Sequence, residues 1–176
     1  MIDDRPSSFR FPRGSAIGIN KAEKLSHLEI GKGRIIQEGN TIALVNFGAR
    51  LEACKQAIES LKPRGCHPTL MDARFAKPLD TNLLDKILNN HEFVITIEEG
   101  SIGGFSSAVL DYVHNKRKTS TSSTIKNIIF PDKFVDHNAL ENQYKEMGMD
   151  AQSISNKILS LISNNEVVHL TRYTKK

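Results

Sequence analysis

The chain has 176 residues, of which 39% are hydrophobic and 25% charged, so its length and composition are those of a soluble globular protein with one sizeable core. No apolar run approaches the roughly 20 residues that a membrane helix needs, and the N-terminus is polar rather than a signal peptide. The net charge of +4 comes from scattered basic residues with few aromatic residues among them. These features exclude membrane proteins and argue against nucleic-acid binding, and we expect a cytoplasmic protein.

Neither the two cysteines nor the basic cluster of the chain predicts a functional site. Cys54 and Cys66 lack the spacing of a metal site, and a reduced pair is typical of a cytosolic protein, so both are interpreted as structural. A tight basic cluster at residues 116–118 precedes the polar stretch TSTSST, and we interpret this region as a flexible, solvated loop.

The first 14 residues do not form a domain of their own. Phe9 and Phe11 alternate with Arg10 and are followed by Pro-Arg-Gly, a pattern that predicts one short strand without a hairpin partner. A single strand is not stable alone. Residues 15–29 are polar and show no sustained period, so we interpret them as a linker.

Strands and helices are predicted to alternate from residue 30 onward. Short runs of apolar and β-branched residues predict strands at 33–38, 41–47, 68–71, 93–97 and 125–130. Apolar residues three and four apart predict helices at 49–62, 80–88, 104–114, 138–147 and 150–162, with Asp80 as an N-cap. This alternation predicts a mostly parallel five-stranded sheet with helices on both faces. The turn Gly39-Asn40 would make the first strand antiparallel to the second.

The central motif is VITIEEGSIGGFSS at residues 94–107, where a buried strand ends in two acids and three glycines precede a helix. The carboxyl ends of parallel strands are where open sheets place their functional crevice. Adjacent carboxylates can split their pKa values and act as an acid/base pair. However, successive residues of a strand point to opposite faces, so we interpret Glu98 and Glu99 as structural or interfacial.

Other polar residues also lie near predicted strand ends. Asp72 and Arg74 follow one strand and form either a salt link or part of a binding crevice, of which the salt link is the simpler interpretation. His137 is an acid/base candidate, but no nucleophile or metal ligand accompanies it, which favours packing or a subunit contact. Arg13 lies in a Pro-Arg-Gly turn, where its guanidinium could bind a phosphate or form a surface ion pair.

Five motifs occur in a familiar order: DDRPSSFRFPRG, EIGKGR, DARFAKPLD, IEEGSIGGFSS and PDKFVDH. Over residues 2–162 the chain resembles the carboxyl-terminal part of 1-deoxy-D-xylulose-5-phosphate synthases, members of the thiamine-diphosphate-dependent transketolase group. The resemblance implies that residues 30–162 form a three-layer α/β/α sandwich of the transketolase C-terminal type with one antiparallel strand. It also implies that residues 1–14 are the terminal strand of a truncated pyrimidine-binding domain. Residues 163–176 extend past the usual end of the family and are expected to be disordered or lightly packed.

The resemblance also implies a function for the whole protein. Enzymes of this family use thiamine diphosphate and Mg²⁺ to condense pyruvate with glyceraldehyde 3-phosphate, giving 1-deoxy-D-xylulose 5-phosphate and CO₂ for isoprenoid, thiamine and pyridoxal precursors. They are homodimers. Arg13 matches the family's arginine that binds the phosphate of glyceraldehyde 3-phosphate, so the resemblance favours that role, whereas Arg10 is interpreted as structural.

The expected partners of this chain are the missing N-terminal and pyrimidine-binding domains of the same enzyme. The Gly-Asp-Gly and distant Asn that hold the magnesium diphosphate in this group do not occur in the sequence. No catalytic, cofactor-binding or metal-binding residue is therefore expected in this fragment, which should be inactive alone. Two alternatives stay open: the C-terminal module of a 2-oxo acid dehydrogenase beta subunit, which shares the fold and a Glu-Glu-Gly element, and a non-catalytic binding module.

Overall fold

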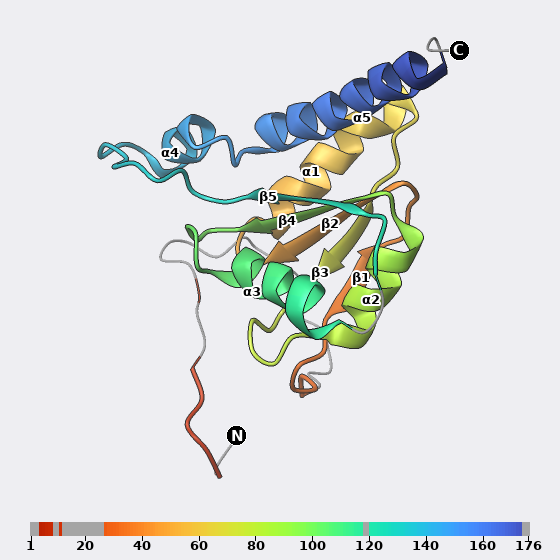
Figure 1. The fold of residues 1–176 in the computed structure, drawn as a ribbon. Coiled ribbons are helices and arrows are strands. Elements are labelled where there is room, and N and C mark those ends of the chain that lie inside the picture. The colour runs from red at the N-terminus through yellow and green to blue at the C-terminus, as the bar shows by residue number, and fades with distance from the viewer. Residues whose placement is uncertain (1–3, 9–10, 12–26, 118–119, 174–176) are drawn as a thin grey trace.

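The computed structural model of the chain describes residues 4–8, 11, 27–117 and 120–173, with side chains as far as residue 163 (Figure 1). The strands are β1 (Arg34–Gln37), β2 (Ile42–Phe47), β3 (Thr69–Asp72), β4 (Phe93–Glu98) and β5 (Thr124–Ile128). The helices are α1 (Leu51–Leu61), α2 (Thr81–Asn90), α3 (Phe105–Asp111), α4 (Leu140–Glu146) and α5 (Ala151–Tyr173). A π-helical turn over Tyr112–Lys116 extends α3.

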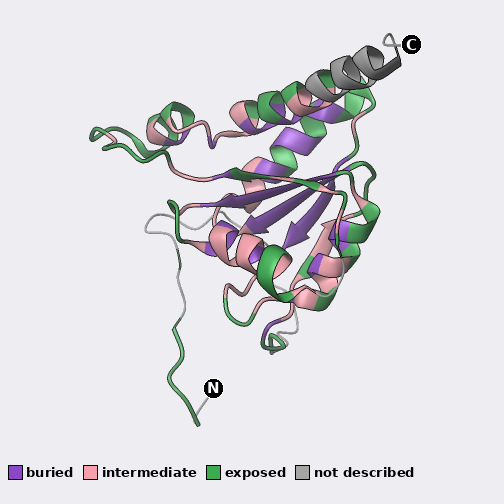
Figure 2. Ribbon diagram, viewed as in Figure 1, coloured by how far each residue is buried: buried purple, intermediate pink, exposed green. Residues whose placement is uncertain are grey.

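The strands form one sheet in the order β1-β3-β2-β4-β5. Strands β2, β3, β4 and β5 are parallel to one another, and β1 is antiparallel to β3. Every residue of β3 and β4 is buried, which explains why these strands lack the alternation of polar residues seen in half-exposed strands (Figure 2). The predicted mostly parallel five-stranded sheet with one antiparallel strand is confirmed.

Two hydrophobic clusters lie on opposite faces of the sheet. Helices α1 and α5 cover one face, and α2 and α3 cover the other (Figure 1). Side chains of β2 alternate between the clusters, because Leu44 packs under α1 and α5 whereas Ala43 and Val45 pack under α2 and α3. The chain is therefore a three-layer α/β/α sandwich.

The pairing of the first strand differs from the predicted hairpin. β1 lies beside β3 rather than β2, and the turn Gly39-Asn40 carries the chain across the beginning of β3. The amide of Gly39 donates to Oγ1 of Thr69 and that of Asn40 to the carbonyl of His67, both at 2.9 Å. A Cβ atom on Gly39 would lie only 2.0 Å from the His67 oxygen. Since β2 has parallel partners on both sides, it offers no edge to which β1 could pair.

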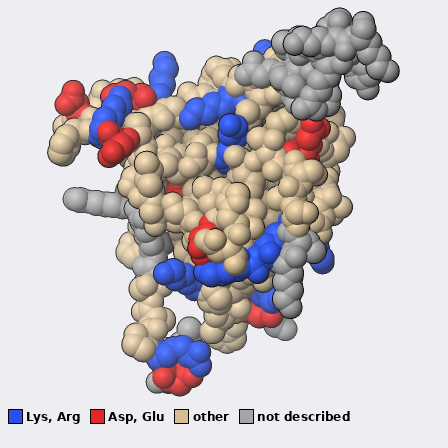
Figure 3. Space-filling view, viewed as in Figure 1, with Lys and Arg blue, Asp and Glu red and all other residues tan. Residues whose placement is uncertain are grey.

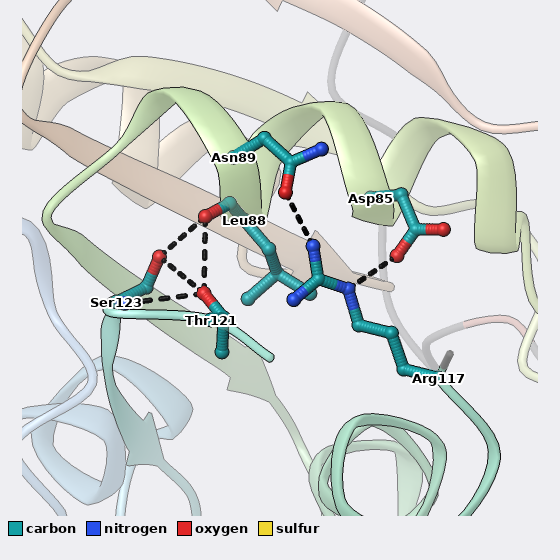
Figure 4. Close-up of polar contacts among 6 residues, drawn as sticks. All are labelled: Asp85, Leu88, Asn89, Arg117, Thr121 and Ser123. Atoms are coloured by element: carbon teal, nitrogen blue, oxygen red, sulfur yellow. Dashed lines mark hydrogen bonds and ion pairs between the residues drawn. The ribbon is translucent and has the colours of Figure 1, made fainter. Parts of the chain in front are cut away.

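Three residues of the segment before β5, Arg117, Thr121 and Ser123, contact α2, so this part of the segment is not the flexible, solvated loop that we expected. The Arg117 side chain is only 1% exposed, and its Nε donates to Oδ1 of Asp85 at 2.7 Å while another guanidinium nitrogen contacts Asn89 (Figure 4). The hydroxyls of Thr121 and Ser123 donate to the carbonyl of Leu88 at the end of α2. The polar composition of this segment predicts a solvated loop, but the last carbonyls of a helix have no partner within the helix, and the hydroxyls of the segment supply one to Leu88.

The structure describes few residues before residue 27. Residues 9, 10 and 12–26 lie outside the described residues, so the predicted terminal strand and most of the predicted linker stay predictions. At the other end, α5 continues as one helix to Tyr173, and the expectation that residues 163–176 are disordered or lightly packed stays a prediction, because the side chains beyond residue 163 lie outside the described part. The sequence beyond residue 162 contains no Pro or Gly to stop a helix. No helix in the described part of the chain is long and apolar enough to cross a membrane.

Candidate functional site

The carboxylate of Glu98 caps helix α3. Glu98 is the last residue of β4 and is 4% exposed, and its two oxygens accept the amides of Phe105 at 2.9 Å and Ser106 at 2.7 Å. The first amides of a helix have no partner within the helix, and a negative charge is favourable there. Glu98 therefore fixes the start of α3 relative to the end of β4.

The glycines after β4 make room for this carboxylate. A Cβ atom would lie 2.7 Å from Oε2 of Glu98 if placed on Gly100, and 2.4 Å if placed on Gly104. The turn can therefore wrap closely around the acid only with glycine at these positions. Because Glu98 already occupies the amides at the start of α3, this glycine-rich turn serves a protein carboxylate and does not leave those amides for a phosphate.

Glu99 points away from Glu98 and joins a second cluster. Nε of Arg50 lies 2.8 Å from Oε1 of Glu99, and the Tyr144 hydroxyl donates to the same oxygen at 2.6 Å. The Arg50 guanidinium also stacks on the Tyr144 ring, 3.4 Å from its centroid. Burial, together with the neighbouring Glu99 carboxylate, raises the pKa of Tyr144 to about 12. The cluster attaches α4 to the ends of β2 and β4, and the structural interpretation of the two acids agrees with this geometry.

Asp72 and Arg74 form the salt link favoured from the sequence, with an additional partner. Oδ2 of Asp72 lies 3.0 Å from Nε of Arg34, on the antiparallel strand, and 3.7 Å from Nε of Arg74. Arg74 adopts a left-handed backbone with φ of 57°, which is uncommon for a residue other than glycine and often marks a functional position. The predicted N-cap Asp80 is confirmed, because it accepts the amide of Leu83 at 3.0 Å.

A groove of about 1670 Å³ runs along this edge of the sheet between α3 and the segment that joins β3 to α2. Its basic residues are Arg74, Lys77 and Lys116. Figure 3 shows basic side chains gathered over the end of α3 with an acidic side chain beside them. Phe11 and Leu28 also line the groove. Concave sites at the carboxyl edge of parallel sheets are the usual position for ligands in this fold class.

Other candidates lie apart from the groove. His137 is exposed on the segment between β5 and α4 and does not line the groove. Both cysteines are free; Cys54 is fully buried, which raises its pKa to about 12, and partial burial raises the pKa of Cys66. Neither has the lowered pKa of a reactive thiol. Within the part of the chain that the structure describes, no group of three His, Cys, Asp or Glu residues could hold a metal ion.

Sequence reasoning missed two members of the Glu99 cluster. Arg50 was overlooked although it lies just after β2, at the same edge of the sheet, and that position was a usable signal. Tyr144 comes from α4, and no local pattern indicates which strand end it reaches. Arg13, the predicted phosphate ligand, lies outside the described residues, so its role stays a prediction.

The mixed five-stranded sheet and the groove at its carboxyl edge define an α/β/α sandwich domain of the kind that carries ligand sites at strand ends. Residues 31–154 match the family model described as transketolase, C-terminal domain. The chain belongs to this family.

The comparisons with individual proteins agree. The chain is 43% identical over 163 residues to a protein of Oryza sativa subsp. japonica named probable 1-deoxy-D-xylulose-5-phosphate synthase 2, chloroplastic, covering 92% of this chain and 23% of the relative. Among solved structures, a split-gene transketolase described as an inactive beta4 tetramer is 24% identical with a TM-score of 0.64, covering 76% of this chain and 42% of that one. A Pichia stipitis transketolase in complex with xylulose 5-phosphate is 11% identical with a TM-score of 0.53, covering 77% and 18%. The chain thus spans about a quarter of the rice relative, and the two structures support the fold alone.

Proposed function

We propose that this chain is the carboxyl-terminal domain of a 1-deoxy-D-xylulose-5-phosphate synthase. The observation that carries the proposal is the 43% identity to the rice synthase across 92% of the chain, which is far closer than the likeness to the transketolases of known structure. The whole enzyme would be a homodimer that condenses pyruvate, after its decarboxylation, with glyceraldehyde 3-phosphate to give 1-deoxy-D-xylulose 5-phosphate and CO₂. The product would feed isoprenoid, thiamine and pyridoxal synthesis.

The contribution of this chain to the reaction would be to hold the phosphate of the acceptor aldehyde. Arg13 would supply a guanidinium, which binds phosphate through two parallel hydrogen bonds. Phe11, two residues earlier, lines the groove at the carboxyl edge, and Arg74 lines the same groove with a left-handed backbone. The Arg74 side chain is 26% exposed and reaches Asp72 only at 3.7 Å, so it retains donors for an anion. We therefore propose Arg74 as a second phosphate ligand.

Thiamine diphosphate and Mg²⁺ would be held by other domains of the enzyme, because the acids at this edge do not fit them. Glu98 is occupied by two helix amides, Glu99 by Arg50 and Tyr144, and Asp72 by Arg34. A magnesium diphosphate site needs free oxygen ligands and free amides. The isolated chain is accordingly proposed to be inactive.

Synthesis of 1-deoxy-D-xylulose 5-phosphate distinguishes the proposed function from the two alternative modules. A 2-oxo acid dehydrogenase module would share the fold, and a non-catalytic binding module would share it too, but neither would support synthesis of the sugar phosphate. The rice relative is named as chloroplastic, so cytoplasmic placement of this chain stays a prediction.

The test replaces the matching carboxyl-terminal region of the rice relative with this chain and follows formation of 1-deoxy-D-xylulose 5-phosphate from pyruvate and glyceraldehyde 3-phosphate. We expect turnover by the joined protein and none by the truncated rice protein or by this chain alone. The unaltered rice protein is the positive control. A soluble, folded joined protein that takes up pyruvate but never forms the sugar phosphate would contradict the proposal and favour the other modules.

A further inference from the structure

Three charged residues meet at the end of β3, and only one of them is an acid. Oδ2 of Asp72 lies 3.0 Å from Nε of Arg34 and 3.7 Å from Nε of Arg74. The first distance is that of a hydrogen bond, and the second is too long for one. Two guanidinium groups thus share one carboxylate, which binds Arg34 directly and leaves the cluster with a surplus positive charge at Arg74.

Arg34 reaches this cluster from a strand that does not line the groove. Strand β1 lies beside β3 at the edge of the sheet, and the antiparallel register places Arg34 opposite Asp72 (Figure 1). Asp72 and Arg74 both line the groove, whereas Arg34 does not. An unpaired Asp72 carboxylate would repel an anion that enters the groove. Arg34 therefore neutralises, from outside, an acid that faces the groove.

The backbone of Arg74 is held in place without the Arg34 side chain. The amide of the preceding residue, Ala73, donates to the carbonyl of Asn46 at 2.8 Å. The carboxylate of Asp80 accepts the amides of Gly33 and Leu83, both at 3.0 Å, and so joins the start of β1 to the start of α2. Loss of the Arg34 side chain would leave these contacts intact and would change the balance of charge around Asp72.

The other acids that line the groove have partners of their own in the described part of the chain. They are Glu98, bound by two amides of α3, Glu99, bound by Arg50, and Asp111, bound by Lys116. Asp72 is the acid within salt-bridge distance of Arg74. The partner that Asp72 takes therefore decides how firmly Arg74 is held.

We propose that Arg34 is a positioning residue of the groove, which binds the Asp72 carboxylate and so keeps the Arg74 guanidinium free to bind a phosphate group. This inference rests on the proposed function, in which Arg74 is a ligand of the acceptor's phosphate. Without Arg34, the Asp72 carboxylate would turn to its remaining basic neighbour, and Arg74 would be held in an ion pair without net charge. A phosphate would then have to compete with Asp72 for Arg74.

The test titrates this chain with inorganic phosphate and follows the Nε–H signals of its arginine side chains by NMR. The Arg74 signal is the one that Arg74→Ala removes. We expect Arg34→Ala to raise the dissociation constant read from this signal about three- to fivefold, which corresponds to the loss of up to about 1 kcal/mol that exposed charge pairs contribute. Arg34→Lys keeps the charge and should recover most of the affinity.

A second substitution separates positioning from a merely structural role. Arg34→Ala combined with Asp72→Asn removes one charge of each sign and leaves no carboxylate to hold Arg74, so it should bind phosphate as tightly as the unaltered chain. A structural role of the ion pair predicts no such rescue. The control is Lys55→Ala, which removes the basic member of another exposed ion pair, with Glu52, outside the groove. The Lys55 side chain is 44% exposed and that of Arg34 50%, and the control should leave the dissociation constant unchanged.

Three results would overturn the inference. They are an Arg74 signal that phosphate shifts no more than sodium chloride of the same ionic strength does, equal affinity of Arg34→Ala and the unaltered chain, and a double variant as weak as Arg34→Ala. The titration needs no turnover, so its outcome is separable from that of the proposed function. A joined enzyme that forms the sugar phosphate while the titration fails would leave the function standing and refute the role of Arg34. The expected titration in an enzyme that forms no sugar phosphate would do the reverse.

Discussion

Replacing Glu98 tests whether its carboxylate organises the edge of the sheet on which the groove lies. Glu98→Ala removes the acceptor of the Phe105 and Ser106 amides, both in buried contacts. A hydrogen bond to a charged group contributes about 1.5 to 3 kcal/mol. Water can enter the space left by the side chain, so we take the lower end for each bond and expect a loss of about 3 kcal/mol. The free energy of unfolding of a native domain is roughly 5 to 15 kcal/mol, so we expect such a variant still to fold.

The assay is urea unfolding followed by circular dichroism. With a slope of about 2 kcal/mol per molar urea, the loss corresponds to a shift of about 1.5 M in the midpoint. Glu98→Gln keeps one acceptor but turns an amide donor toward the second helix amide. Its urea midpoint should therefore fall between those of the unaltered chain and Glu98→Ala. Glu38→Ala removes an exposed acid and should change the free energy of unfolding by less than about 0.5 kcal/mol. If Glu98→Ala behaved like Glu38→Ala, the capping role would be wrong.

Three further outcomes follow from the structure. Folding raises the pKa of Tyr144 from 10.0 to about 12, so its contribution to stability is complete below pH 10 and is lost as the pH rises toward 12. Tyr144→Phe should lower the free energy of unfolding at pH 7 by about 1 kcal/mol and should lack this loss at alkaline pH. Urea titrations that give the same pH profile for both proteins would contradict this. A thiol reagent at neutral pH should modify Cys66 in the native chain but reach Cys54 only after unfolding. Cys66→Ser should therefore abolish labelling of the native chain. Rapid labelling of Cys54 would contradict its burial between α1 and the sheet. Calorimetric titration of the isolated chain with thiamine diphosphate and Mg²⁺ should show no specific heat, and micromolar affinity would overturn the assignment of the cofactor to other domains.

The layered fold was predictable because its elements are locally encoded. Runs such as Ile42–Phe47 are apolar throughout, which is typical of strands buried on both faces, and helix caps such as Asp80 are visible three residues before their partner amide. Pairing of β1 was not predictable in the same way. A Gly-Asn turn indicates a hairpin by local rules, but the contacts of Gly39 with Thr69, 30 residues away, decide the path of the chain.

The candidate site was predictable in position but not in its contacts. The carboxyl end of β4 holds the contacts of Glu98 and Glu99, and the divergence of these two side chains follows from the alternation of a strand. The partners of these acids come from other elements, such as Tyr144 of α4, and only tertiary packing brings them together. The left-handed backbone of Arg74 leaves no signal in the sequence, since the residue is not a glycine.

The central claim is that this chain helps to bind the acceptor's phosphate, and steady-state kinetics of the joined enzyme test it most directly. Arg13→Ala should remove a charge-assisted contact worth roughly 1.5 to 3 kcal/mol, which lowers kcat/KM for glyceraldehyde 3-phosphate by about ten- to more than a hundredfold. Arg74→Ala should act in the same direction, and Arg10→Ala is the control for loss of charge. The kinetic constants for pyruvate should change little, because pyruvate carries no phosphate. An unchanged kcat/KM for the phosphorylated acceptor in Arg13→Ala would contradict the claim.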